Sequence, residues 1–185
     1  CFPSNNLIEA VAQEGIRPIM FRQERGAIMA ADGYSRMNNR KKFGVIITQG
    51  GPGSENCMGG LAQAYADNVP VLYLPGGPAI NQHSVRPSFS PARTYESVCV
   101  YSEVLWKADM TASVLRRAFH RLRNGRPGPV LVEIPADVGT QEVPEASMNY
   151  LPPKRMLQAP SASDVKDAVR LLLNAKKPVI WSGMG

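Results

Sequence analysis

The sequence of 185 residues is poor in the side chains that build metal sites and disulfide frameworks. Its three cysteines, Cys1, Cys57 and Cys99, are odd in number and far apart, so they fit neither a disulfide framework nor the ligand spacing of a zinc site. With only His83 and His120 besides, we expect no metal site built by this chain. This cysteine usage suits a reducing compartment, so we expect a cytoplasmic protein.

Long apolar runs are also missing. No segment approaches the roughly 18 apolar residues of a membrane helix, and the first residues lack the basic, apolar and small-residue regions of a signal peptide. The formal net charge is +6, but the one dense basic cluster, Arg36 to Lys42, has no interleaved aromatic side chains. We interpret that cluster as a solvated loop and expect neither a membrane nor a nucleic acid as a partner.

Several motifs of nucleotide-binding proteins and hydrolases are absent. The stretch Thr48 to Asn56 holds three glycines and a proline between an apolar run and a helical pattern, which predicts a tight turn open to close approach by a ligand. The turn lacks the Lys-Ser/Thr pair of a P-loop and the Gly-x-Gly-x-x-Gly spacing of a dinucleotide site. No Gly-x-Ser-x-Gly elbow of a serine hydrolase occurs.

What is present is a regular alternation of apolar runs and helical patterns. With 44% apolar residues the chain can bury a core, and the alternation predicts an α/β fold with a doubly wound, mostly parallel sheet and helices on both faces. The expected strands are 17–21, 43–48, 69–74 and 130–134; helices are expected from Ser4 to Gly15, after Glu24, around 61–65 and around 114–122.

Two stretches break this alternation. Pro78 to Ser102 has little periodicity, which inside a compact domain is typical of a lid or a pocket wall. The proline-rich stretch 144–162 predicts a linker between a domain over 1–143 and the truncated start of a Rossmann-like domain over 163–185, with a helix and then a strand over 178–181. Since the chain opens without Met and without the first strand of this fold class, we expect a fragment of a longer protein.

Glu24 is the first candidate for a functional side chain. It stands where the apolar run ending at Phe21 gives way to helical spacing, and such strand-to-helix junctions line the ligand crevice of open parallel sheets. The alternative is structural, because acidic residues are common in the first turn of a helix, where the macrodipole favours them. The glycine turn at the next junction adds weight to the functional interpretation.

Together these two junctions resemble the pyrimidine-binding domain of thiamine-diphosphate enzymes of the acetolactate synthase and 2-keto acid decarboxylase group. The stretch Arg22 to Arg36 is similar to the family pattern Arg-His-Glu-x-x-Ala-x-x-x-Ala-x-Gly-Tyr-Ala-Arg, with Gln23 in place of the histidine. The resemblance continues through Gly-Pro-Gly-x-x-Asn and reaches Gly-Arg-Pro-Gly-Pro-Val-Leu-Val-Glu-Ile-Pro-Ala-Asp-Val at 125–138. It covers about four-fifths of the chain.

The resemblance implies thiamine diphosphate and Mg²⁺ as cofactors. In the family, a glutamate at the position of Glu24 hydrogen-bonds the aminopyrimidine ring and promotes the proton transfer that activates the cofactor. The backbone of Gly51, Pro52 and Gly53 would pack against the cofactor, and Asn56 would support that turn. The family's Gly-Asp-Gly…Asn motif, which holds magnesium and the diphosphate, does not occur in this sequence, so those ligands are expected outside it and this stretch alone is expected to be inactive.

The resemblance also implies a lyase or carboligase that acts on a 2-keto acid or acyl donor, in a homodimer or homotetramer with the cofactor at a subunit interface. In the family, the segment matching Pro78 to Ser102 reaches the substrate and often carries a Phe-Gln pair. Here Ser90 follows Phe89, which favours a substrate other than, or broader than, pyruvate alone. Gln82, His83 and Phe89 are the candidate substrate contacts, with a plain surface role as the alternative for Gln82 and for His83.

Two other functions remain open at this point. One is a non-catalytic interaction domain with the same fold; retention of a carboxylate at position 24 argues against it. The other is a nucleotide- or flavin-binding module resting on the glycine turns, which the missing fingerprint spacing disfavours.

Overall fold

The computed structural model describes residues 4–183, which form two separate compact units divided between Arg155 and Met156. The first unit contains one sheet of four parallel strands in the order β1-β2-β4-β3. The strands are β1 (Gly44–Thr48), β2 (Val71–Gly77), β3 (Tyr101–Val104) and β4 (Pro129–Pro135). The α-helices of this unit are α1 (Asn5–Gln13), α2 (Glu24–Met37), α3 (Pro52–Glu55), α4 (Met58–Ala66), α5 (Pro91–Thr94) and α6 (Thr111–Arg123). Short 3₁₀ turns occupy Ile80–Gln82, Glu96–Val98, Ala108–Met110 and Glu145–Met148.

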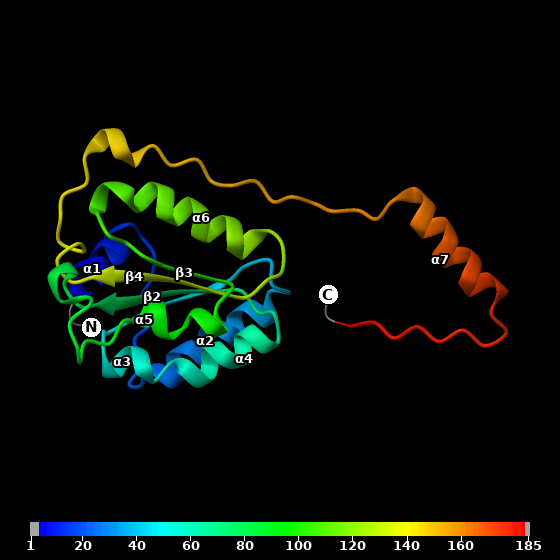
Figure 1. Ribbon diagram of the computed structural model, residues 1–185, viewed down its shortest axis with the longest axis horizontal. Helices are drawn as coiled ribbons and strands as arrows, with labels where there is room; N and C mark the ends of the chain where they lie inside the picture. The colour runs from blue at the N-terminus through cyan, green and yellow to red at the C-terminus, as the bar shows by residue number, and fades with distance from the viewer. Residues whose placement is uncertain (1–3, 184–185) are drawn as a thin grey trace. The chain divides into compact units, whose positions relative to one another are not determined.

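Helices cover both faces of the sheet (Figure 1): α6 lies on one side, and α2, α3, α4 and α5 lie on the other. The pleat of β2 explains the division, since successive side chains of a strand point to opposite faces. Val71 and Tyr73 pack in one buried cluster with Ile28 of α2, whereas Leu72 packs in a second cluster with Val114 of α6. The predicted α/β fold, with a parallel sheet between two layers of helices, is confirmed.

The prediction of a strand over Arg17–Phe21 is wrong. This stretch is irregular, and its apolar side chains are exposed, from 45% at Phe21 to 69% at Met20. An apolar, extended sequence becomes a strand only when a neighbouring strand supplies hydrogen-bond partners. β1 stands at the edge of the sheet beside β2 alone, and no strand among residues 4–183 lies beyond it to receive Arg17–Phe21.

Two further differences concern short segments. β3 lies at the end of the stretch for which the sequence predicted no regular structure; its backbone pairs with β4, although Tyr101, Ser102 and Glu103 carry no apolar alternation. The helix expected around 61–65 is preceded by a separate four-residue turn of helix, α3, which follows the glycine turn directly. The first difference reflects pairing with β4, which overrides a weak local pattern.

The linker begins as part of the first unit. Hydrogen bonds from α6 and its C-cap hold its backbone: Arg116 donates to the Asn149 carbonyl at 3.1 Å, Arg123 to Pro153 at 3.4 Å and Asn124 to Lys154 at 3.1 Å. The ring of Tyr150 packs edge-on against Phe119. The linker backbone from Asn149 to Lys154 is therefore attached along α6.

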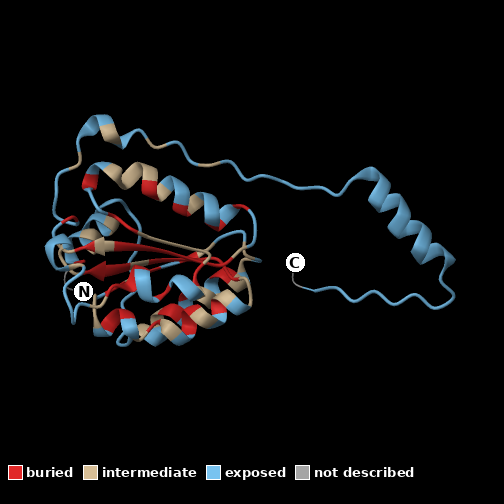
Figure 2. Ribbon diagram, in the orientation of Figure 1, coloured by how far each residue is buried: buried red, intermediate tan, exposed pale blue. Residues whose placement is uncertain are grey.

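The second unit contains one helix, α7 (Ala162–Asn174), capped by Ser161, whose hydroxyl accepts from the Asp164 amide at 3.1 Å. All of its residues up to Gly183 are exposed (Figure 2). The strand expected over Pro178–Trp181 does not form, because this unit offers no neighbouring strand among its described residues, and Trp181 is 94% exposed. No second α/β domain is seen up to residue 183. Within the described part of the chain, no helix has the length and apolar character needed to cross a membrane.

Candidate functional site

Glu24 is the first residue of α2 and is partly buried. Gln23 before it has extended backbone angles and serves as the N-cap, its side-chain oxygen accepting from the Arg25 amide at 3.0 Å. Because the cap is made by the neighbouring glutamine, the Glu24 carboxylate is free to turn toward other groups while still benefiting from the positive end of the helix dipole.

The glycine turn follows β1 at the carboxyl end of the sheet. Gly51 adopts φ +62°, a left-handed conformation that glycine tolerates best, and Pro52 then opens α3 at its first position. A side chain at Gly50 would also collide with the Gly76 carbonyl, which would lie 2.7 Å from its Cβ. Glycine at these positions thus fixes both the direction of the turn and its close approach to the end of β2.

The turn and the start of α2 meet at the Glu24 carboxylate. Asn56, directly after α3, donates its side-chain amide to Glu24 Oε2 at 3.1 Å. A Cβ built on Gly53 would lie 3.1 Å from Glu24 Oε1, so only a glycine leaves this oxygen uncrowded. The structure therefore brings together Glu24, Gly53 and Asn56, with Gly51 and Pro52 in the same turn.

Buried side chains support the turn from below. The Thr48 and Tyr73 hydroxyl groups lie 2.9 Å apart, and Tyr73 and Tyr95 both donate to the Ser54 carbonyl. Cys57, with no exposed surface, packs in the same cluster. Burial raises the pKa of the Cys57 thiol to about 11, so this cysteine stays protonated and unreactive at neutral pH.

The three expected substrate-side residues lie elsewhere on the segment after β2. Gln82 is exposed at the end of a 3₁₀ turn. His83 Nε2 lies 3.0 Å from Glu133 Oε1, and its ring packs edge-on against Trp106 at 4.7 Å. Phe89 is partly buried, with its ring 6.4 Å from that of Tyr95. Among residues 4–183, no hydrogen bond joins any of the three to Glu24.

Glu133 is a buried carboxylate beside His83 that the sequence did not lead us to expect. It has no exposed surface, and besides His83 its carboxylate accepts from Ser90 Oγ at 2.9 Å and from the Ala92 amide at 2.8 Å. The three bonds tie the segment after β2 to β4. A charged residue inside the apolar run Val130 to Ile134 was the signal, because a charge is rarely fully buried without partners.

An open cleft of about 560 Å³ is lined by residues that follow the carboxyl ends of β2, β3 and β4. Its lining includes the Trp106 indole, which contacts His83, together with residues that follow the three strands. The lining residues are Ile80, Trp106, Lys107, Ala108, Asp109, Gln141, Glu142 and Pro144. The carboxyl edge of the sheet thus presents two regions: the Glu24 and glycine-turn contact after β1, and this cleft after the other strands.

Comparison with known families joins these observations. Residues 2–96 match the model of the thiamine pyrophosphate enzyme, N-terminal TPP binding domain. The chain belongs to this family. The matched residues include both Glu24 and the glycine turn, so the contact between Asn56 and Glu24 lies inside the matched part of the chain.

Curated relatives of this thiamine pyrophosphate enzyme domain share about a third of its residues. It is 34% identical over 178 residues to the acetolactate synthase large subunit of Lactococcus lactis and 33% identical over 175 residues to glyoxylate carboligase of Escherichia coli O157:H7. It is 31% identical to chloroplastic acetolactate synthase 3 of Brassica napus. These matches cover 92% to 93% of this chain but only 27% to 30% of the relatives, so the chain spans less than a third of their length.

The side chains at the Glu24 site fit the aminopyrimidine part of thiamine diphosphate. Asn56 occupies one carboxylate oxygen of Glu24, while within residues 4–183 no hydrogen bond reaches the other, Oε1. An unused carboxylate oxygen beside an uncrowded glycine backbone suits a flat ring with a protonated nitrogen. No group of three His, Cys, Asp or Glu side chains able to hold a metal ion occurs among the described residues.

Proposed function

We propose that this domain forms the aminopyrimidine half of a thiamine-diphosphate site in a lyase or carboligase that cleaves or makes a carbon–carbon bond next to a carbonyl. The carrying observation is the Glu24 carboxylate, held by Asn56 through one oxygen and open through the other, at the edge of a family-defining glycine turn. Glu24, the Gly51–Gly53 backbone and Asn56 are the residues that would hold the cofactor.

Glu24 has the central part in this proposal. Its Oε1 would accept a hydrogen bond from the protonated ring nitrogen of the aminopyrimidine, and the carboxylate would be placed to exchange that proton with the ring. Asn56 would keep the carboxylate oriented, and Gly53 would leave room for the ring to lie against the backbone. When bound, thiamine diphosphate supplies the carbon nucleophile and the electron sink. Magnesium and the diphosphate would be held by residues outside this sequence.

For the substrate we propose a 2-keto acid or acyl donor other than, or broader than, pyruvate. Support comes from Ser90, which stands after Phe89 in place of the family's glutamine and donates its hydroxyl to Glu133 at 2.9 Å. The proposed substrate side is His83 together with the cleft lined by Trp106, whose ring contacts His83. Gln82 ends the 3₁₀ turn whose first residue, Ile80, lines the same cleft. One methylene changes discrimination in such pockets by only about 1–3 kcal/mol, so related substrates should also react.

We further propose that the active protein is a homodimer or homotetramer. The helix that begins at Glu24 leaves apolar side chains exposed, with Met29 at 57% and Met37 at 85%, which a second copy would cover. A flavin- or nucleotide-binding function is less well supported, because the glycine turn leads into α3, a helix of four residues that is too short for the dipole-assisted phosphate site of those folds.

The decisive experiment is Glu24→Gln in the full-length protein that carries this domain. Loss of an acid–base group costs about 10²–10⁴-fold in turnover, and we expect a loss in this range at saturating thiamine diphosphate with the circular dichroism spectrum unchanged. Glu55→Gln, one residue before Asn56, is the matched control and should keep wild-type turnover. Full activity of Glu24→Gln would overturn the assignment.

A panel of 2-keto acids and oxalyl thioesters, with and without an aldehyde acceptor, identifies the reaction. Carbon dioxide release without acceptor indicates a decarboxylase, and acceptor-dependent product indicates a carboligase. Efficient conversion of pyruvate alone to acetolactate would contradict the substrate proposal.

A further inference from the structure

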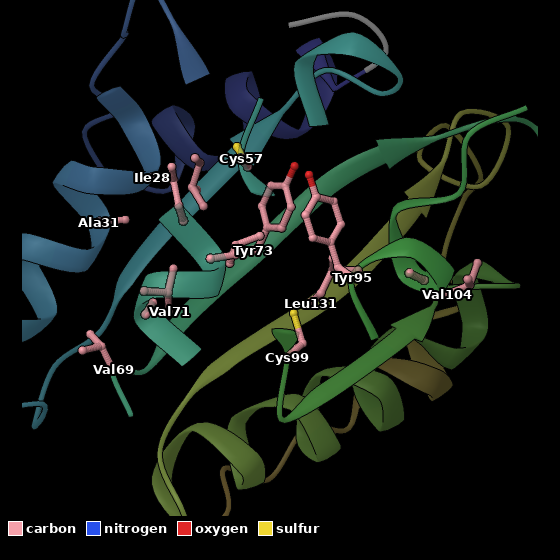
Figure 3. Packing of buried hydrophobic residues seen from close by; sticks show 14 residues of the cluster. Ile28, Ala31, Cys57, Val69, Val71, Tyr73, Tyr95, Cys99, Val104 and Leu131 are labelled. Carbon is pink, nitrogen blue, oxygen red and sulfur yellow. The ribbon is translucent and has the colours of Figure 1, made fainter. Parts of the chain in front are cut away.

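Tyr95 is a fully buried residue in the segment after β2, between α5 and the 3₁₀ turn Glu96–Val98. Its hydroxyl donates to the carbonyl oxygen of Ser54, in α3 of the glycine turn. Figure 3 shows its ring beside that of Tyr73, with both hydroxyl groups directed to the end of the cluster where Cys57 lies. A residue 41 positions away in sequence thus reaches the backbone of the cofactor turn.

The Ser54 carbonyl is the point on which the turn is fixed. Besides Tyr95, it accepts from Tyr73 at 3.4 Å and from the Cys57 amide at 3.1 Å. The Ser54 hydroxyl in turn donates to the Gly51 carbonyl at 2.8 Å, so both ends of the turn depend on this residue. A buried carbonyl oxygen is stabilised by the groups that donate to it. Removal of the Tyr95 or Tyr73 hydroxyl therefore shifts the preferred position of the Ser54 backbone.

Ser54 directly follows Gly53 and stands two residues before Asn56; Gly53 and Asn56 are the two turn residues that meet Glu24. Gly53 approaches Glu24 Oε1, and Asn56 donates to Glu24 Oε2. A shift of the Ser54 backbone therefore changes the distance from Asn56 to the carboxylate as well as the room over Gly53. The hydroxyl that holds Ser54 acts on Glu24 through this path.

The ring of Tyr95 makes a second connection. It stands edge-on to Tyr73 at 5.9 Å and edge-on to Phe89 at 6.4 Å, with interplanar angles of 85° and 80°. Such edge-to-face pairs have defined geometry, so the position of Phe89 and the position of the Tyr95 hydroxyl depend on one another. Phe89 belongs to the proposed substrate-side segment, and Ser54 belongs to the cofactor turn.

We propose that Tyr95 is a positioning residue that ties the segment after β2 to the glycine turn and so holds Asn56 and Glu24 in register for thiamine diphosphate. The catalytic part of this inference rests on the proposed function; the structural part, control of the Asn56–Glu24 contact by the Tyr95 hydroxyl, does not. Burial raises the pKa of Tyr95 and of Tyr73, so both hydroxyl groups remain donors at neutral pH.

The first test uses the chain itself, without ligand. In Tyr95→Phe we expect the amides of Glu55, Asn56 and Cys57 to exchange with deuterium about tenfold faster, and the nuclear magnetic resonance signals of the Asn56 side-chain amide to move toward those of a free amide. Tyr73→Phe should act in the same direction but more weakly, because its hydroxyl also pairs with Thr48. Exchange at Leu131 in β4 serves as the reference for global stability.

Tyr101→Phe is the matched control, since its hydroxyl bonds Glu103 and Arg117 on the far side of the sheet. It should leave the Asn56 signals unchanged. If Tyr95→Phe speeds exchange equally at Leu131 and at the turn, or leaves the Asn56 side-chain signals where they are, the positioning role is wrong and the hydroxyl only stabilises the core.

The second test uses the full-length protein. We expect Tyr95→Phe to lower kcat at saturating thiamine diphosphate by about 10–100-fold, with Tyr101→Phe unaffected, because small misplacements of a reacting group are costly. Unchanged kcat together with altered Asn56 signals would overturn the catalytic part of the inference. A protein with no dependence on thiamine diphosphate, but with the expected Asn56 response, would overturn the proposed function and leave the structural part standing.

Discussion

Replacement of Glu133 by alanine should be among the most damaging single changes in this domain. The carboxylate has no exposed surface and accepts three hydrogen bonds, from Ser90 at 2.9 Å, from the Ala92 amide at 2.8 Å and from His83 at 3.0 Å. Glu133→Ala leaves the first two donors buried without a partner, since Ser90 and Ala92 are each only 8% exposed.

The expected loss follows from these donors. An unpaired buried donor costs about 1–3 kcal/mol, so two donors cost on the order of 2–6 kcal/mol. The cavity adds to this loss, and removal of a buried charge offsets part of it. We expect a net loss of about 3 kcal/mol, a large part of the roughly 5–15 kcal/mol that stabilises a typical domain. Glu133→Gln keeps the shape of the side chain and one acceptor oxygen. Its free energy of unfolding should therefore fall by about half as much as that of Glu133→Ala.

Equilibrium unfolding in urea, followed by far-ultraviolet circular dichroism near neutral pH, measures this loss. The matched control is Glu103→Ala: that carboxylate is paired with Arg117 near the surface, where the Arg117 side chain is 46% exposed, so its removal should cost no more than about 1 kcal/mol. If Glu133→Ala unfolds at the same urea concentration as Glu103→Ala, the carboxylate does not hold the segment after β2, and our interpretation of its three bonds is wrong.

Two further predictions concern stability. Gly44→Ala should destabilise the domain by about 1–3 kcal/mol or more, because the new Cβ would lie 2.3 Å from the Ala31 carbonyl oxygen of α2. A Cβ at Gly33 has no atom within 4 Å, so Gly33→Ala should stabilise α2 by about 0.5–1 kcal/mol. Equal urea midpoints for the two variants would contradict this prediction. Burial raises the pKa of the Cys57 thiol from 9.0 to about 11. Between these pH values the folded chain keeps a proton that the unfolded chain loses. The contribution of the protonated thiol to the free energy of unfolding is therefore fully present below pH 9 and is lost as the pH rises to about 11. Stability measured across that window should fall less steeply in Cys57→Ala than in the wild type, and identical slopes would show that the thiol is not involved.

The sequence predicted those parts of the fold that depend on local pattern. β1, β2, β4 and α6 were predictable because each buries an apolar run or stripe, and the start of α2 at Glu24 because a helical repeat begins there. Arg17–Phe21 has an equally apolar pattern but no neighbouring strand among residues 4–183, so its pattern alone misled. A strand is defined by its neighbour as much as by its own residues.

The candidate site was predictable in the same partial way. Residue type and spacing alone identify the glycines of the turn and the carboxylate of Glu24 as candidates. Residue type and spacing do not identify Tyr95 and Ser54, because a hydrogen bond between residues 41 positions apart has no effect on the local sequence pattern. Glu133 lies between these cases: its charge within an apolar strand signals partners, but only the fold shows that they are His83, Ser90 and Ala92.

The linker held along α6 has a consequence for building chimaeras. Arg116, Arg123 and Asn124 all bind its backbone carbonyls, so most side chains of 149–154 can be exchanged without loss of these bonds, whereas the three donors cannot. A fusion joined after Arg155 keeps this attachment, and the added partner then starts from a defined point on the surface. A fusion joined at Val143 removes the whole attached stretch, including Tyr150, and so exposes the ring of Phe119 on α6. No hydrogen bond to α6 then fixes the position at which the added partner begins.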